Sequence, residues 1–169
     1  MDAAGSGFGW ESVPVTTASG YELNMFHLIS STPDTKGPVL LTSGLYSESL
    51  DWVSASDSSV PNRPAQLVQS GYDVWIGETR GARYSYGHST LNLGLDVDNA
   101  AYWDYSFPDI GREDYGVFVD KIIAERPGAA CSKVTVVAHS GAANEATCMA
   151  LEPGMADKVG KLVTLAPCL

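Results

Sequence analysis

The chain has 169 residues, of which 44 % are apolar and 18 % charged, and it carries a formal net charge of −10 at pH 7. This length fits one domain, and the apolar share favours a globular protein over a disordered one. The acidic balance, without any run of lysine or arginine, argues against nucleic acid and anionic membranes as partners.

The N-terminus, the apolar runs and the cysteines show which targeting, membrane and metal-binding features the sequence does not predict. The first ten residues, MDAAGSGFGW, have no basic start and no apolar stretch, so no signal peptide is expected. No apolar run is long enough to predict a transmembrane segment. The three cysteines Cys131, Cys148 and Cys168 lie far apart, so we expect no disulfide framework, no metal site and no cofactor.

Turn residues and apolar runs divide the chain into alternating strands and helices. Residues 13–30 predict an antiparallel hairpin that turns at Ala18-Ser19-Gly20. Strands are expected at 38–42, 72–77, 134–138 and 162–166, and helices at 64–69, 109–126 and 142–151. The segment from Glu78 to about Pro108 is expected to be a long polar and aromatic loop. Compact apolar strands that alternate with helices predict an α/β fold with a mostly parallel sheet flanked by helices.

Ser140 is the first candidate for chemistry. The segment Ala138-His139-Ser140-Gly141-Ala142 lies where the strand 134–138 runs into the helix 142–151. It has the form of the G-x-S-x-G nucleophile elbow with both outer glycines replaced by alanine. Such a turn lifts the serine hydroxyl above the sheet and directs it toward the free N–H groups of the following helix. Small residues also flank serines by chance, so the motif alone leaves a structural turn open.

A second loop follows an earlier strand. Thr42-Ser43-Gly44-Leu45 comes directly after the strand 38–42, where hydrolases with a nucleophile elbow carry the second amide of the oxyanion hole. The N–H groups of Leu45 and Gly141 are therefore the candidate pair. On spacing alone, Ser43-Gly44 also fits a plain turn after a strand.

Several motifs in order along the chain resemble the acid lipases, that is, the gastric and lysosomal acid lipases and the related steryl ester hydrolases. The matching segments are VTTASGY (15–21), LTSGL (41–45) with Asp51-Trp52, GYDVWIG (71–77) with Arg80-Gly81, Tyr84-Ser85 and His88, WDYSF (103–107) and VAHSGA (137–142). The resemblance implies an α/β-hydrolase fold, of which the chain would be the N-terminal half with the first six strands. It then forms a single partial domain at 1–169, with the hairpin at 1–30 and the parallel core at 31–169.

The same resemblance implies a function. It suggests hydrolysis of carboxylic esters of apolar alcohols, such as acylglycerols or steryl esters, with Ser140 as nucleophile and the N–H groups of Leu45 and Gly141 as the oxyanion hole. It also suggests a secreted or lysosomal protein, although no signal peptide is seen. The chain departs from the family pattern at Ser43, where the family has histidine, and at Gly141, where it has glutamine.

The triad acid and histidine are expected to be absent from this chain, because both follow later strands in this fold. A serine without a base is a poor nucleophile at neutral pH. His27, His88 and His139 are the only histidines, and His88 is the least improbable substitute. Three explanations stay open: a piece of a full lipase, half of a split enzyme, or an inactive subunit of hydrolase origin in a larger assembly. In each of them other polypeptide would cover the apolar strand 162–166, which is otherwise an open sheet edge.

Two further side chains have competing interpretations. Trp52, beside the oxyanion loop, is a candidate for contact with the acyl chain of the substrate, whereas tryptophan more often fills a core. Arg80 fits a loop-pinning ion pair better than a ligand site, with Glu78 as the nearest acidic candidate. The acids Asp51, Asp104 and Asp109 are expected to be helix caps or solvated loop groups.

Overall fold

A single mixed sheet organises the computed structural model, which describes residues 9–30, 34–54, 62–126 and 133–167. The strands of this part of the chain are β1 (Gly9–Thr16), β2 (Tyr21–Ile29), β3 (Pro38–Thr42), β4 (Asp73–Glu78), β5 (Gly87–His88), β6 (Val134–His139) and β7 (Val159–Leu165). The helices are α1 (Leu50–Val53), α2 (Arg63–Gln69), α3 (Asp96–Tyr102), α4 (Phe107–Asp109), the π-helical turn η1 (Ile110–Asp114), α5 (Tyr115–Ala124), α6 (Ala142–Leu151) and α7 (Met155–Lys158).

The strand order in the sheet is β1-β2-β4-β3-β6-β7, and β5 pairs with the start of β2. The β1/β2 and β2/β4 pairs are antiparallel, whereas β4/β3, β3/β6 and β6/β7 are parallel. The predicted hairpin and the predicted parallel core are therefore confirmed as two parts of one sheet. Its parallel strands place the ends of β3, β4 and β6 side by side, with Thr42 in register with both Gly77 and Ala138.

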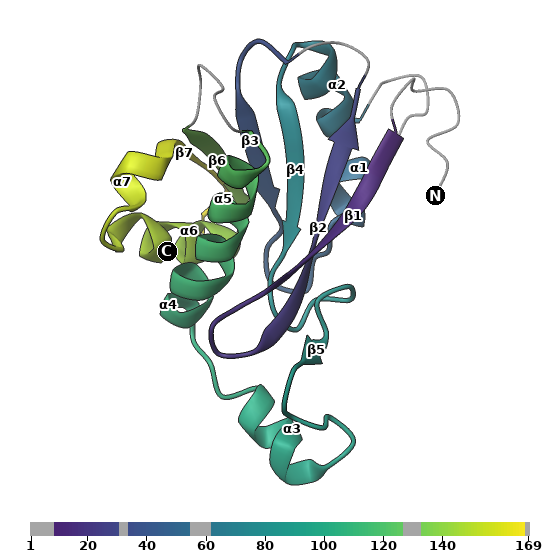
Figure 1. Ribbon diagram of the computed structural model, residues 1–169, viewed down its shortest axis with the longest axis vertical. Helices are drawn as coiled ribbons and strands as arrows, with labels where there is room; N and C mark the ends of the chain where they lie inside the picture. Colours follow the sequence, from purple (N-terminus) through teal and green to yellow (C-terminus); the bar gives the residue numbers. More distant parts are fainter. Residues whose placement is uncertain (1–8, 31–33, 55–61, 127–132, 168–169) are drawn as a thin grey trace.

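Alternation along the central strands sends side chains to both faces of the sheet. Leu40 of β3 and Trp75 of β4 point to the face that is covered by α5 and α6, where they join the larger core cluster. Their neighbours Leu41 and Ile76 point to the other face, which α1 and α2 cover with a smaller cluster. Figure 1 shows the two layers of helices with the sheet between them. This period of two is what a sheet buried on both faces requires.

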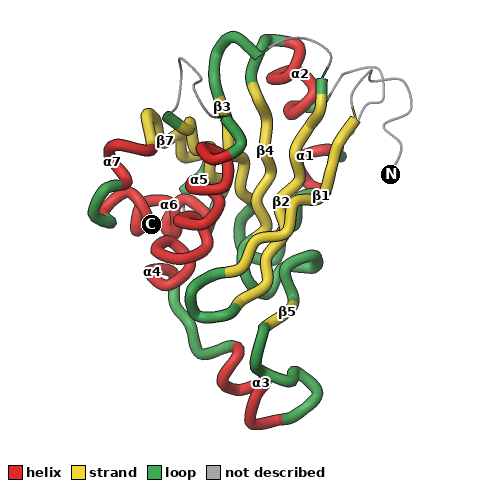
Figure 2. Tube along the Cα trace, viewed as in Figure 1, coloured by secondary structure: helices red, strands yellow, loops and turns green. Residues whose placement is uncertain are grey.

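The sequence did not predict the short helices α1 and α7, and it placed β7 at 162–166; two longer segments also differ from the expectation. The predicted loop 78–108 contains the short strand β5, which pairs with the start of β2, and the helix α3; together they form an arm that projects past the end of the sheet (Figure 2). The acidic first turn of α3 and the burial of Tyr102 at its end explain why a helix forms in so polar a segment. The predicted helix 109–126 begins at Phe107, passes through the π-helical turn and ends at Ala124.

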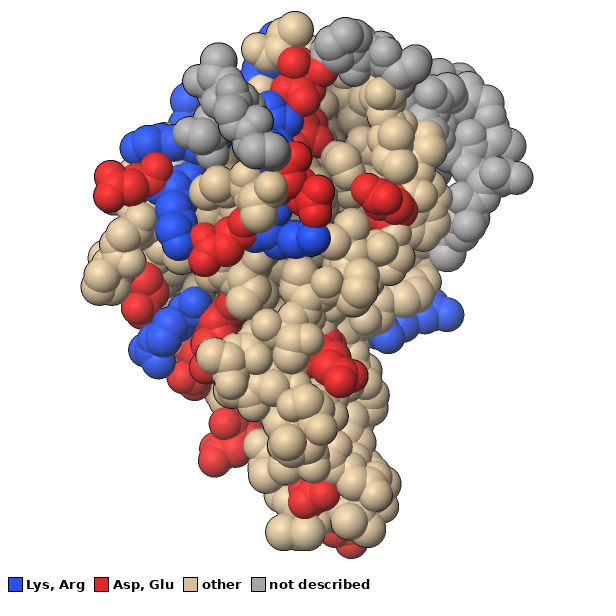
Figure 3. Space-filling view, viewed as in Figure 1, with Lys and Arg blue, Asp and Glu red and all other residues tan. Residues whose placement is uncertain are grey.

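The charged side chains on the surface differ between the body of the molecule and the arm. Acidic and basic side chains intermingle over the body of the molecule, whereas the arm shows only acidic and uncharged ones on the face seen in Figure 3. Lys121 pairs with Glu125, and Lys158 pairs with Asp120, on the exposed side of α5 and α7. Within the described ranges, every helix is too short or too polar to cross a bilayer.

Candidate active site

Ser140 occupies a sharp turn between β6 and α6. Its backbone is in the left-handed region, with φ of 56°, which is unusual for a residue other than glycine. Its N–H donates to the carbonyl oxygen of Leu165 at 2.8 Å, and its own carbonyl accepts from the N–H of Ala143 at 3.0 Å. Ala138 and Ala142 are fully buried on either side of the turn, so their small side chains meet the steric demand predicted from the sequence.

The loop after β3 lies directly against this turn. A Cβ on Gly44 would come within 2.7 Å of the Cβ of Ser140 and 2.9 Å of the carbonyl oxygen of His139, so the approach requires glycine. A Cβ on Gly141 would lie 3.4 Å from the backbone nitrogen of Leu45. The structure thus brings the backbone of Leu45 beside Gly141, next to Ser140. Their role as oxyanion donors stays a prediction.

Buried polar groups brace the end of β4 next to the site. The Glu78 carboxylate accepts from the N–H groups of Ser49 and Tyr84 at 2.8 and 2.9 Å. It does not pair with Arg80, which was its expected partner. The expectation that Glu78 pairs with Arg80 is therefore wrong, since Glu78 instead holds two loops together by their backbone N–H groups.

Arg80 forms the loop-pinning ion pair that was expected, with other partners. Its guanidinium lies 2.6 Å from Asp114 and 3.0 Å from Glu113, and it stacks on Tyr21 with 3.8 Å to the ring centroid. Burial lowers the pKa of Arg80, but the hydrogen bonds and charges of the two carboxylates outweigh it and raise that pKa. Asp114 belongs to the π-helical turn, so the pair joins the loop after β4 to the start of α5.

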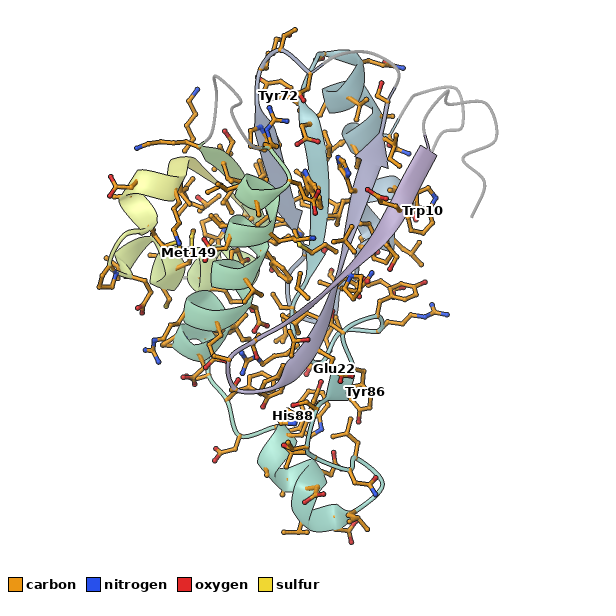
Figure 4. The ribbon with its side chains drawn as sticks, in the orientation of Figure 1. Trp10, Glu22, Tyr72, Tyr86, His88 and Met149 are labelled. Carbon is orange, nitrogen blue, oxygen red and sulfur yellow. The ribbon has the colours of Figure 1, made fainter. Side chains whose placement is uncertain are left out.

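The histidines do not gather at Ser140. His27 bridges Glu11 and Asp73 at 3.1 and 2.7 Å and stacks on Trp75. His88 lies in the arm, where its Nδ1 accepts from the N–H of Leu91 at 3.1 Å. Figure 4 shows His88 near the base of the arm, well away from Met149 of α6.

The remaining candidates have structural surroundings. Trp52 is buried in the smaller core cluster beside Leu41, and its predicted contact with the acyl chain stays a prediction. Asp51 and Asp109 accept from the backbone N–H groups of Glu48 and Ser106, as expected for capping residues. His139 is exposed next to Ser140.

Sequence reasoning missed two buried polar residues behind the elbow, Tyr115 and Glu145. The Tyr115 hydroxyl donates to Oγ1 of Thr42 and to the carbonyl of Ala142. Glu145 lies on the face of α6 that also carries Ala142, Ala146 and Met149, all in the core. A single acid on an otherwise apolar helical face was the available signal.

Comparison with known proteins gives the family relationship. Lipase 1 of Drosophila melanogaster is 32% identical to this chain over 165 residues, which is 95% of the chain and 34% of the fly protein. Triacylglycerol lipase 1 of Arabidopsis thaliana is 31% identical over 160 residues, covering 90% and 37%. Gastric triacylglycerol lipase of Mus musculus is 27% identical over 169 residues, covering 95% and 40%. No family model matches the chain.

The solved structures show the fold. Brefeldin A esterase superposes with a TM-score of 0.56 at 18% identity, covering 96% of this chain and 41% of the esterase. The Pyrococcus furiosus esterase Pf2001 gives 0.60 at 17%, covering 99% and 52%. The chain has the α/β-hydrolase fold in part and spans between a third and two fifths of the length of the lipases named above. The resemblance to the acid lipases is confirmed.

Proposed function

We propose, on the premise that the chain is a homologue of the acid lipases, that it carries the nucleophile and the oxyanion hole of a serine ester hydrolase. The observation that supports this most directly is the left-handed backbone of Ser140 between β6 and α6. A strained turn of this kind at a strand-to-helix junction is the geometry of the nucleophile elbow. The substrate class is an ester of an apolar alcohol, such as an acylglycerol or a steryl ester.

The chemistry follows from the placement of three groups. The Ser140 hydroxyl gives its proton to a base and attacks the ester carbonyl carbon, and the carbonyl oxygen gains the negative charge. The N–H groups of Leu45 and Gly141 then stabilise this oxyanion, and each such donor is worth roughly 3 to 4 kcal/mol in the transition state. The positive end of the α6 dipole adds to their effect. Collapse of this intermediate expels the alcohol, which takes up that proton, and water then hydrolyses the acyl-serine.

A base and an acid must complete the site. His27 and His88 are engaged with other partners away from the elbow, so neither is placed to deprotonate Ser140. We infer that the triad histidine and acid come from polypeptide outside these 169 residues. The inactive-subunit alternative differs in one respect: the rest of the assembly would then bring no histidine to Ser140.

The exposed face of β7 supports the same inference. Its sequence, VGKLVTL, is mostly apolar, yet Val163 is 39% exposed at the edge of the described sheet. Apolar edge strands are normally covered or paired. A cysteine placed at Val163 should react with a maleimide in the isolated chain and be protected in the complete protein. Equal reactivity in both would argue against a covering segment at this edge.

A fluorophosphonate probe tests the proposed chemistry. In the complete protein we expect labelling at Ser140 that is lost in Ser140→Ala and kept in Ser43→Ala, whose hydroxyl donates to the Glu48 carbonyl. The isolated chain should hydrolyse a short p-nitrophenyl ester no faster than its Ser140→Ala variant. Absence of labelling in the complete protein would favour the inactive subunit, and clear turnover by the isolated chain would show that it contains its own base.

A further inference from the structure

One tyrosine hydroxyl contacts both of the segments that form the candidate site. Tyr115, at the start of α5, is fully buried. Its hydroxyl donates to Oγ1 of Thr42 at 2.8 Å and to the carbonyl oxygen of Ala142 at 3.1 Å. Thr42 is the last residue of β3, just before the loop that carries Leu45. Ala142 follows Gly141 in the first turn of α6. The position of one side chain therefore bears on the separation of the two candidate amides.

Glu145 stands behind this hydroxyl on the next turn of α6. Only 6% of it is exposed, and its Oε2 has no hydrogen-bond partner in the described part of the chain. Burial raises the pKa of Glu145, and the hydrogen bond that the Tyr115 hydroxyl can offer to its carboxylate lowers that pKa by less. The charged and titratable groups facing it are Asp114, which is paired with Arg80, and the hydroxyls of Tyr115 and Tyr105.

The number of hydrogens available decides whether Tyr115 or Glu145 can donate to the other. A tyrosine hydroxyl has one hydrogen, which here is shared between Thr42 and Ala142, and its oxygen has lone pairs left to accept. Glu145 can contact Tyr115 without taking that hydrogen only when its own carboxyl is protonated and donates. Burial first, and then the charge of Asp114, raise the pKa of Glu145 to about 8, which keeps it neutral at pH 7.

We propose that Tyr115 is a positioning residue for the nucleophile elbow, and that the buried carboxyl group of Glu145 keeps the tyrosine hydroxyl directed at Thr42 and Ala142. When Glu145 loses its proton, the carboxylate draws the Tyr115 hydrogen to itself and releases the two segments. The separation of the Leu45 and Gly141 amides then loosens above neutral pH. The catalytic consequence rests on the proposed function, whereas the hydrogen-bonded tie itself does not.

Amide hydrogen exchange, followed by NMR and corrected for intrinsic rates, tests the tie without any turnover. The reporters are the N–H groups of Ser140, Ala143 and Ser47, which donate to the carbonyl oxygens of Leu165, Ser140 and Gly44 respectively. In Tyr115→Phe we expect their exchange to rise at least tenfold at pH 7. In the wild type the same rise should occur between pH 7 and pH 9. Glu145→Gln, whose amide donates at any pH, should lack that rise.

Tyr102→Phe is the matched control, because it also removes a fully buried hydroxyl, which here contacts Gly81 and Ser85. It should leave the three reporter amides unchanged. If Tyr115→Phe leaves them unchanged as well, the tie is wrong. If Glu145→Gln shows the alkaline rise of the wild type, the control of the tie by Glu145 is wrong.

Turnover by the complete protein separates the two proposals. If activity depends on Ser140, Tyr115→Phe should lower kcat about tenfold and leave KM within a factor of about two of the wild-type value. The wild type should lose kcat above about pH 8, and Glu145→Gln should not. Unchanged kcat in Tyr115→Phe would overturn the positioning role alone. Turnover that survives Ser140→Ala would overturn the proposed function and the catalytic consequence with it, while the exchange data would still decide on the tie.

Discussion

Replacing Glu145 by glutamine should change how the stability of the chain depends on pH. Burial and the neighbouring Asp114 raise the pKa of Glu145 from 4.5 to about 8 in the folded chain. Between these values the folded state holds a proton that the unfolded state has released, so rising pH destabilises the wild type until pH exceeds the folded pKa. A shift of about 3.5 units corresponds to roughly 5 kcal/mol in total, of which about 4 kcal/mol falls between pH 5 and pH 9.

Urea unfolding at several pH values measures this difference. The free energy of unfolding of Glu145→Gln, relative to the wild type, should rise by about 4 kcal/mol from pH 5 to pH 9, because other titrating groups cancel in the comparison. Glu152→Gln is the control, since Glu152 ends the same helix on the surface, paired with Arg112. It should keep the pH dependence of the wild type. A constant offset between Glu145→Gln and the wild type would mean that Glu145 is already ionised at neutral pH.

Three other substitutions probe the site and its supports. Gly44→Ala places a Cβ against the backbone and Cβ at the elbow, so the rate of fluorophosphonate labelling of Ser140 in the complete protein should fall at least tenfold. Asp114→Asn leaves the buried Arg80 guanidinium short of its main counter-charge and should cost about 3 to 5 kcal/mol in urea unfolding. Burial lowers the pKa of His27, but the hydrogen bonds to two carboxylates outweigh burial and raise that pKa. Protonated His27 therefore stabilises the fold fully below about pH 6.5, and this stabilisation is lost as the pH rises through the pKa of the folded state. His27→Asn should therefore flatten this part of the pH dependence in thermal unfolding.

Matched variants keep these results interpretable. Gly116→Ala, on α5, has only the Cε of Met155 at 3.9 Å from the added Cβ, so labelling of Ser140 should not change. Labelling of Gly44→Ala at the wild-type rate would show that the loop can yield without loss of function. Full stability of Asp114→Asn would mean that Glu113 alone satisfies Arg80. An unchanged pH dependence in His27→Asn would show that His27 does not contribute to the pH dependence of stability.

Local patterns carried most of the fold prediction. Strands β3, β4 and β6 are compact apolar runs bounded by turn residues, and helix α6 was predicted with its observed bounds, because the signals lie within each segment. The sharp turn at Ser140 was also readable, since small residues flank Ser140 in the sequence itself.

What failed depends on contacts between distant segments. Helix α3 was missed because its stability comes from packing Tyr102 against Tyr21 rather than from apolar periodicity. The partner of Arg80 was wrong because Asp114 is 34 positions away and reaches it only through the π-helical turn. No local pattern brings Tyr115 to Ala142, so the support behind the candidate site could only be seen in three dimensions.

The last strand of the described sheet is hydrogen-bonded directly to the turn at Ser140. The carbonyl of Leu165, at the end of β7, receives the amide hydrogen of Ser140. Polypeptide that paired with the other side of β7 would therefore contact the strand whose Leu165 carbonyl holds the Ser140 amide. Pairing at that edge would couple the position of the added polypeptide to the orientation of the Ser140 backbone through a single hydrogen bond.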